Sequence, residues 1–168
     1  MSKQHRCIVF VVSDRAARGE RADETADLLR PILEGAGFEL EDVVVVPDER
    51  ALLADALRDA CGRAGLVLTT GGTGVAPRDV TPEATRDVLE LEIPGLAEEM
   101  RRRSLETTPK ALGSRAVAGA RGEAVVLNLP GRPAGAVDCL GYVLETLPHL
   151  VALRQGPVPD ASHEPGAG

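Results

Sequence analysis

The sequence VLTTGGTGVAPRDVTPEAT, residues 67–85, joins an apolar run to a glycine-rich turn and then to a helical pattern. The apolar residues 66–68 are typical of a strand that is buried in a parallel sheet. Three glycines among residues 71–74 allow backbone conformations that other residues resist, and they let a ligand approach the main chain closely. The stretch therefore predicts a buried strand that ends in a turn able to contact a ligand.

The start of the following helix strengthens this prediction. Thr81 and Pro82 are expected at the N-cap and the first helical position, and Glu83 complements the positive end of the helix dipole. Free N–H groups then face a space beyond the carboxyl end of a strand, where anions bind well. Arg78 adds a positive charge there and Asp79 adds a carboxylate. We expect an anion-binding turn with a built-in acid.

An ordinary tight turn is the alternative, since turns use glycine and proline freely. The named phosphate-binding loops do not fit this sequence. A Walker loop ends in Gly-Lys-Ser/Thr, and no lysine lies nearby. The dinucleotide-binding fingerprint requires a third glycine where Pro77 stands.

Strands and helices are predicted to alternate along the rest of the chain. Expected strands are residues 7–12, 43–46 and 66–68, with a hairpin of residues 116–120 and 123–128. Expected helices are residues 23–36, with an interruption at Pro31, and 49–62, 82–89, 96–105 and 133–151. The pattern predicts an α/β fold, a three-layer αβα domain over residues 1–154 with a mostly parallel sheet plus a short antiparallel hairpin. The Pro- and Gly-rich tail, residues 155–168, is predicted to be disordered.

Composition excludes several classes of protein. The 168 residues are 43% hydrophobic and carry a net charge of −7, and their one basic cluster, residues 101–103, falls in a predicted helix. No apolar run reaches membrane-spanning length, and the first residues lack the apolar core of a signal peptide. We expect a cytoplasmic protein with no nucleic-acid or membrane partner.

Thiol and imidazole chemistry are also disfavoured. Cys7, Cys61 and Cys139 are an odd number without metal-ligand spacing, so they are expected to be small buried thiols. No histidine stands at the predicted mouth of the sheet, so a hydrolytic triad is not expected. Carboxylates and backbone N–H groups remain as the groups for chemistry.

Two carboxylates are predicted to converge at the mouth of the sheet. Asp48 follows the second strand and Asp79 the third, and parallel strands place their carboxyl ends on one side. Two carboxylates beside a polyphosphate substrate suggest a Mg²⁺ site. The alternative is that Asp48 caps the next helix and Asp79 caps the turn.

Three motifs together carry a resemblance to a known family. Residues 67–85, the segment NLPGRP at 128–133 and Ser13-Asp14 after the first strand occur in order between about residue 6 and about residue 153. In this order they resemble the molybdopterin adenylyltransferase family, the Mog/MoaB type of molybdenum-cofactor biosynthesis protein. The resemblance implies that ATP and molybdopterin are substrates, that Mg²⁺ assists, and that the products are adenylylated molybdopterin and pyrophosphate.

The resemblance also implies roles for individual residues. Asp79 corresponds to the family's essential carboxylate and Asp48 to its second acid. Positions for phosphate, nucleotide and pterin binding are Gly71, Gly72, Thr73, Gly74, Arg78, Ser13, Asp14, Glu98, Ser104, Ser114, Arg115, Asn128, Pro130 and Gly131. Glu98 as a helix-surface acid, Ser104 as a helix-end residue and Arg115 as a surface ion-pair partner are the alternatives at three of them. Arg132 departs from the family, which often has a small or uncharged polar residue there, and it could add a phosphate contact or narrow the pterin pocket.

Two other functions stay open at this point. A relative of the MoaB type can bind molybdopterin without catalysing transfer, and a nucleotide-processing hydrolase of the competence/damage-inducible family carries a related domain. The presence of both Asp48 and Asp79 favours the enzyme. The resemblance further implies a homotrimer or homohexamer, and association with other molybdenum-cofactor biosynthesis proteins is a further expectation.

Overall fold

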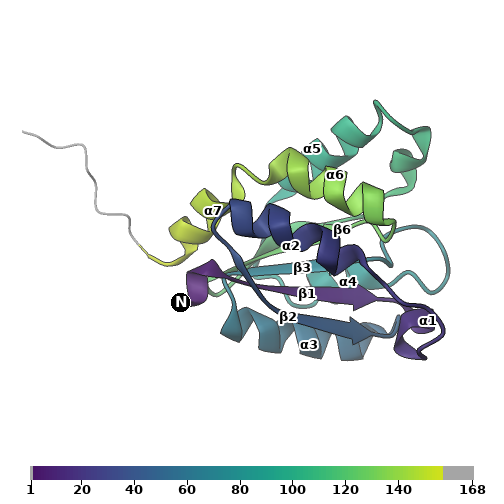
Figure 1. Cartoon of the computed structure of the whole chain (residues 1–168), viewed down its shortest axis with the longest axis horizontal. Helices are drawn as coiled ribbons and strands as arrows, with labels where there is room; N and C mark the ends of the chain where they lie inside the picture. Colours follow the sequence, from purple (N-terminus) through teal and green to yellow (C-terminus); the bar gives the residue numbers. More distant parts are fainter. Residues whose placement is uncertain (1, 157–168) are drawn as a thin grey trace, which may run out of the picture.

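A six-stranded sheet with the strand order β2-β1-β3-β6-β5-β4 forms the centre of the molecule (Figure 1). The strands are β1 (Arg6–Val12), β2 (Glu39–Val46), β3 (Leu66–Thr70), β4 (Leu91–Glu92), β5 (Ala118–Arg121) and β6 (Ala124–Leu129). β2, β1, β3 and β6 run parallel, whereas β5 pairs antiparallel with β6 and β4 antiparallel with β5. This computed structural model describes residues 2–156, so residues 157–168 of the predicted tail lie outside the described part.

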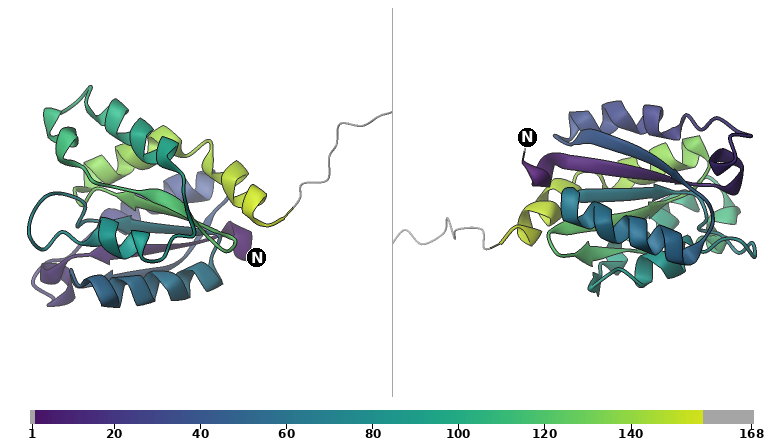
Figure 2. Two further views of the ribbon diagram at one scale, coloured as in Figure 1. Left: turned by 180° about the vertical axis from the view of Figure 1, so that it is seen from behind. Right: turned by 90° about the horizontal axis from the view of Figure 1, so that it is seen from below.

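Helices cover both faces of the sheet. They are α1 (Asp14–Ala17), α2 (Thr25–Gly35), α3 (Arg50–Arg63), α4 (Thr81–Arg86), α5 (Pro94–Ser104), α6 (Pro133–Val143) and α7 (Leu147–Arg154), with 3₁₀ turns η1 (Lys3–His5) and η2 (Pro109–Gly113). Side chains alternate across a strand, so Cys7 and Val9 of β1 face α2, α5, α6 and α7, and Ile8 and Phe10 face α3 and α4. The right view of Figure 2 shows α3 lying along its face of the sheet. The predicted three-layer αβα fold with a mostly parallel sheet and an antiparallel hairpin is confirmed.

Several boundaries differ from the predictions, each for a local reason. The segment between the predicted strand 7–12 and the predicted helix 23–36 contains α1, because the Ser13 hydroxyl accepts a hydrogen bond from the Ala16 N–H and caps one helical turn. Pro31 does not interrupt α2, whose face with Leu29 and Leu33 is fully buried. The prediction of one last helix is wrong, since α6 and α7 are bent by 66°. Pro148, at the start of α7, cannot donate the N–H that a continuous helix needs. The edge strand β4 has two residues, which is too short to produce an alternating pattern.

The buried cysteines agree with the prediction. Cys7, Cys61 and Cys139 are all free thiols inside the protein. Within residues 2–156 no single helix is long and apolar enough to cross a membrane, and only the bent pair α6 and α7 together reaches that length and composition.

The sheet topology determines where a ligand can bind. The chain moves from β1 to β2 on one side and then crosses to β3 on the other side of β1. A crevice therefore opens beyond the carboxyl ends of β1 and β3, at the switch point where ligands of open α/β sheets bind. Figure 1 and the left view of Figure 2 show α1, the loop after β3 and the η2 segment together at this end.

Candidate functional site

The glycine turn after β3 has the special backbone geometry that its sequence predicts. Gly71 and Gly72 have φ angles of +95° and +68°, in the region that favours glycine. A Cβ on Gly71 would lie 2.5 Å from the Val12 carbonyl oxygen, and a Cβ on Gly72 would collide with the Thr81 hydroxyl. The turn therefore packs directly against the end of β1, and neither glycine can be replaced without strain.

Thr81 stabilises the turn from the other side, and it does not cap the helix. Val80 occupies the N-cap position of α4 without a side-chain cap, so the prediction for Thr81 and Pro82 was wrong by one residue. The Thr81 hydroxyl donates to the Gly71 carbonyl at 2.9 Å, and its N–H donates to the Gly72 carbonyl at 3.1 Å. The threonine is fully buried, so its hydroxyl needs a hydrogen-bond partner inside the protein, and the Gly71 carbonyl provides it.

Arg115 holds the far half of the same loop. Its guanidinium donates to the carbonyl oxygens of Gly74 at 2.7 Å and Asp79 at 2.9 Å, and it forms an ion pair with Glu83. Its N–H donates to the Thr73 carbonyl at 2.8 Å. The Arg115 pair lowers the pKa of Glu83 below its ordinary value. Arg115 lines neither pocket, and its Nε, Nη1 and Nη2 each donate within the protein, which agrees with the ion-pair alternative and gives the residue a positioning role.

A second cluster of charges joins the ends of β1 and β2. Asp14 and Asp48 exchange hydrogen bonds of 2.9 Å, each carboxylate accepting from the other residue's N–H. Arg78 donates to both oxygens of Asp14 at 2.9 and 3.0 Å, so its charge is already paired. The hydrogen bonds from Arg78 lower the pKa of Asp14, and the hydrogen bond from the Asp48 N–H lowers it further.

Asp48 is the carboxylate with the opposite shift. Burial raises the pKa of Asp48, and the charges of Asp14 and Asp79 add to that effect. The alternative that Asp48 caps α3 is excluded, because Glu49 occupies the N-cap and makes no side-chain cap. Asp48 Oδ1 lies 3.1 Å from the position of a Cβ on Gly72, so the carboxylate contacts the turn. Asp48 and Asp79 thus converge on the glycine turn, as predicted.

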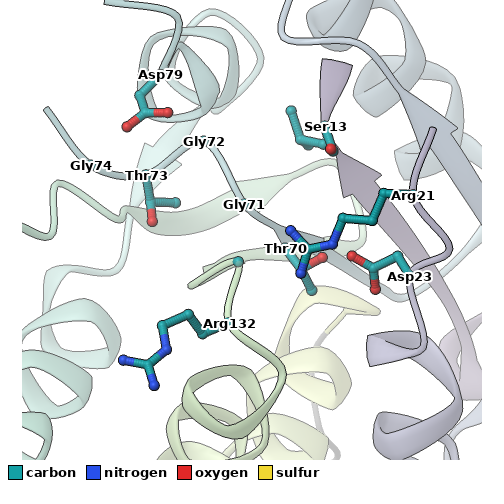
Figure 3. Close-up of a pocket in the computed structure, with 12 residues that line it drawn as sticks. Ser13, Arg21, Asp23, Thr70, Gly71, Gly72, Thr73, Gly74, Asp79 and Arg132 are labelled. Carbon is teal, nitrogen blue, oxygen red and sulfur yellow. The ribbon is translucent and has the colours of Figure 1, made fainter. Parts of the chain in front are cut away.

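Asp79 both closes the loop and faces the crevice. Its Oδ2 accepts from the Ala76 N–H at 3.1 Å and lies 2.9 Å from the position of a Cβ on Gly74. One oxygen of Asp79 therefore caps the turn, as the alternative predicted, and the other has no hydrogen-bond partner among the described residues. Figure 3 shows the side chain beside a pocket on the inner side of the loop.

This smaller pocket has a volume of about 320 Å³ and lies over the glycine turn (Figure 3). Its lining is mostly polar: Val12, Ser13, Arg21, Asp23, Thr70, Gly71, Gly72, Thr73, Gly74, Asp79, Gly131 and Arg132. No residue of α4 lines it, so the predicted contribution of that helix's N–H groups is not observed there. The turn itself, and not the helix that follows, forms the floor.

A larger pocket of about 610 Å³ adjoins it on the side of α5 and α6. Its lining is more apolar and includes Met100, Arg101, Ser104, Lys110, Ser114, Asn128, Pro130 and Tyr142. Thr73, Gly74 and Arg132 line both pockets. The two spaces therefore meet above the second half of the glycine turn.

The remaining predicted residues divide between these spaces and the interior. Ser104, at the end of α5, and Ser114 line the larger pocket, whereas Glu98 is exposed on α5 and lines neither pocket. Asn128 is fully buried and donates to the hydroxyls of Thr69 and Thr85 at 3.0 and 2.9 Å. Its amide therefore ties β6 to β3 and α4 while the residue borders the larger pocket.

Sequence reasoning missed part of both linings. Arg21 and Asp23 come from the loop before α2, and Tyr142 is a half-buried residue of α6. None of these residues belongs to a motif, and only the folding of distant segments brings them to the crevice. Arg132 belongs to the NLPGRP motif and is a predicted departure from the family, and the structure adds that it lines both pockets.

Comparison with known proteins places this geometry in a family. A family model described as "Probable molybdopterin binding domain" matches residues 8–149. The molybdopterin adenylyltransferase of Escherichia coli K12 is 39% identical over 170 residues, which is 91% of this chain and 87% of that protein. The crystal structure of the molybdopterin biosynthesis enzyme MoaB from Thermus thermophilus has a TM-score of 0.85 and 48% identity, covering 92% of this chain and 98% of that one.

A more distant structure shares the fold. The protein CinA from Thermoplasma acidophilum has a TM-score of 0.67 but only 19% identity, over 87% of this chain and 99% of that one. That likeness shows a shared fold alone. The family match, the relatives and the motifs of the glycine turn agree with one another, and the chain belongs to the molybdopterin-binding domain family, which includes the Mog- and MoaB-type proteins of molybdenum-cofactor biosynthesis.

Proposed function

We propose that the protein is a molybdopterin adenylyltransferase, which transfers AMP from ATP to the phosphate of molybdopterin and releases pyrophosphate. The relatives that are named molybdopterin adenylyltransferase match most of the chain. The observation that carries the proposal is the meeting of two pockets at one glycine turn, with Thr73, Gly74 and Arg132 common to both. A transfer between two large substrates requires such a shared boundary.

The linings suit the two substrates differently. The smaller, polar pocket contains Ser13 and the backbone of residues 71–74, which suit the phosphates of ATP. The larger pocket offers Met100 and Tyr142 as apolar surface for a pterin, together with hydroxyls such as Ser104. We therefore assign ATP to the smaller pocket and molybdopterin to the larger one.

Asp48 and Asp79 fit a Mg²⁺ ion that arrives with the nucleotide. One oxygen of each carboxylate has no hydrogen-bond partner within residues 2–156, although no cluster of three metal-ligating side chains occurs there. Mg²⁺ is usually bound by one or two carboxylates with phosphate oxygens and water completing its shell. Asp79 lines the smaller pocket and suits that role directly, whereas Asp48 lines neither pocket and lies beside the glycine turn. A bound ion would neutralise phosphate charge as it develops.

Positioning accounts for the rest of the reaction. A phosphate oxygen of molybdopterin forms a bond to the α-phosphorus of ATP, while the bond from that phosphorus to the bridging oxygen breaks and pyrophosphate leaves. No covalent nucleophile is needed, so the protein has to align two phosphate groups and exclude water. The rigid turn, held by Thr81 and Arg115, provides that alignment.

The test mixes the protein with molybdopterin and Mg-ATP and follows adenylylated molybdopterin by chromatography. Asp79→Asn keeps an oxygen for the Ala76 N–H but removes the charge, so we expect normal folding and a loss of activity of about 100-fold or more. Asp59→Asn, at an exposed residue of α3, is the matched control and should retain full activity.

The outcomes separate the proposed enzyme from the alternative. Product from the parent and the control, but not from Asp79→Asn, supports the transferase. Tight binding of molybdopterin without product from the parent would overturn it and leave a non-catalytic binding protein. Pyrophosphate release in the absence of molybdopterin would instead indicate a hydrolase.

Assembly and location complete the proposal. We propose a cytoplasmic homotrimer or homohexamer that works beside other molybdenum-cofactor biosynthesis proteins, as the family resemblance implies. Light scattering on the purified protein measures the oligomeric state, and a monomer at micromolar concentration would contradict it.

A further inference from the structure

Three cations near the two pockets already have partners inside the protein. Arg78 pairs with Asp14, Arg115 is fully engaged by the loop, and Arg101 donates to the Ala116 carbonyl at 2.8 Å. These guanidiniums support the walls of the site. Of these three only Arg101 lines a pocket, the larger one, so phosphate charge at the smaller pocket is left to other cations.

Three cations of the lining, Arg21, Lys110 and Arg132, have no side-chain hydrogen bond or ion pair within residues 2–156. Arg21 lines only the smaller pocket and Lys110 only the larger one. Arg132 is the one cation of the described chain that lines both. Figure 3 shows Arg21 beside Thr70 and Asp23 on one side and Arg132 on the side of Thr73 and Gly74.

The main chain of Arg132 is held in place although its guanidinium is free. The preceding Gly131 packs on the glycine turn, where a Cβ would lie 3.1 Å from the Gly71 Cα, and the Gly71 N–H donates to the Leu129 carbonyl at 3.1 Å. Pro133 then begins α6 directly after Arg132. The base of the side chain is thus fixed beside the turn, and the residue is exposed where the two pockets meet.

We propose that Arg132 binds phosphate oxygens of both substrates at the boundary of the two pockets, whereas Arg21 binds only the nucleotide. The inference rests on the proposed function, because it assigns the two pockets to ATP and molybdopterin. A guanidinium presents five donors in a planar fork, which suits two neighbouring phosphate groups better than an ammonium does. In the proposed reaction the phosphate of molybdopterin meets the α-phosphate of ATP at this boundary, and both groups are anionic.

The experiment measures binding of each ligand separately by calorimetry. The probes are molybdopterin and an ATP analogue with a non-hydrolysable bond between the α- and β-phosphorus, both with Mg²⁺. We expect Arg132→Ala to weaken both affinities by about 10- to 100-fold, the usual range for one charge-assisted contact. Arg21→Ala should weaken only the nucleotide, and Arg132→Lys should recover part of both affinities.

Controls exclude an effect on folding. The Arg132 guanidinium has no partner among residues 2–156, so Arg132→Ala should unfold at the temperature of the parent protein. Arg58→Ala, whose side chain pairs with Asp55 on the outer side of α3, should bind both probes normally.

Two failures are distinguishable. If the parent binds both probes and Arg132→Ala weakens one or neither, the bridging role is overturned while the proposed function stands. If the parent binds neither probe, the proposed function fails and the inference fails with it. The proposed division between the two arginines is supported if Arg132→Ala weakens binding of both probes and Arg21→Ala weakens binding of the nucleotide alone.

Discussion

Replacing Arg115 with alanine tests whether the glycine loop depends on a single side chain. The guanidinium bonds two carbonyls of the loop, those of Gly74 and Asp79, and forms an ion pair with Glu83. Arg115→Ala removes all three contacts at once. It also removes the cation that pairs with Glu83. The other Glu83 oxygen is already buried without a hydrogen-bond partner, so the substitution leaves the whole carboxylate without that support.

The size of the effect follows from these contacts and their exposure. A hydrogen bond to a charged group contributes about 1.5–3 kcal/mol when it is well buried. The Arg115 and Glu83 side chains are 34% and 33% exposed, so water replaces part of what is lost. We expect the free energy of unfolding to fall by about 2–4 kcal/mol, which lowers the melting temperature by about 5–15 °C in a chain of this size.

Urea unfolding followed by circular dichroism measures this change. Arg102→Ala is the control, because Arg102 is 62% exposed and its pair with Glu99 lies on the surface, where ion pairs contribute little. Arg115→Lys keeps the charge near Glu83 but cannot reach both carbonyls, so it should fall between the parent and Arg115→Ala. If Arg115→Ala is as stable as Arg102→Ala, the positioning role assigned to Arg115 is refuted.

The other predictions concern backbone strain, pH and thiol reactivity. Gly71→Ala forces a side chain into a positive φ and against the Val12 carbonyl, so it should cost about 2–4 kcal/mol of stability in urea unfolding; a change within error would contradict the geometry of the turn. The Arg78 pair lowers the pKa of Asp14, so it stabilises the fold above the ordinary aspartate pKa and is lost as pH falls through the lowered value. Arg78→Ala should therefore be less stable than the parent at neutral pH, with the difference shrinking on acidification; a constant difference would count against the pair. Burial raises the pKa of Cys61 to about 11, so iodoacetamide should alkylate it only after unfolding, as read by mass spectrometry; rapid labelling of the native protein would show that Cys61 is accessible.

Local signals explain why so much of the fold was predictable. β1 and β3 are runs of apolar residues buried on both faces, and such runs are distinctive in a sequence. The failures occur where a local pattern is too short or ambiguous. α1 depends on one cap by Ser13, and β4 is two residues long and exists only because β5 lies beside it.

The candidate site shows the same division. Its glycine turn was predictable because positive φ angles at Gly71 and Gly72 favour one residue type, and because an acid beside such a turn is a local pattern. The contacts of Arg115 with the loop could not be predicted, since its partners Gly74, Asp79 and Glu83 lie more than thirty residues away in the chain.

The sequence by itself determined the α/β class, the glycine turn, the two carboxylates and the family, because each depends on residue types and spacings within short segments. Only the tertiary structure decided which cations are free to bind phosphate and which are used to support the loop. That choice depends on side-chain contacts between distant segments, and periodicity and motifs do not record them. Arg78 and Arg115 stood in the predicted site but serve the protein's own framework, whereas Arg132 lies where the two pockets meet.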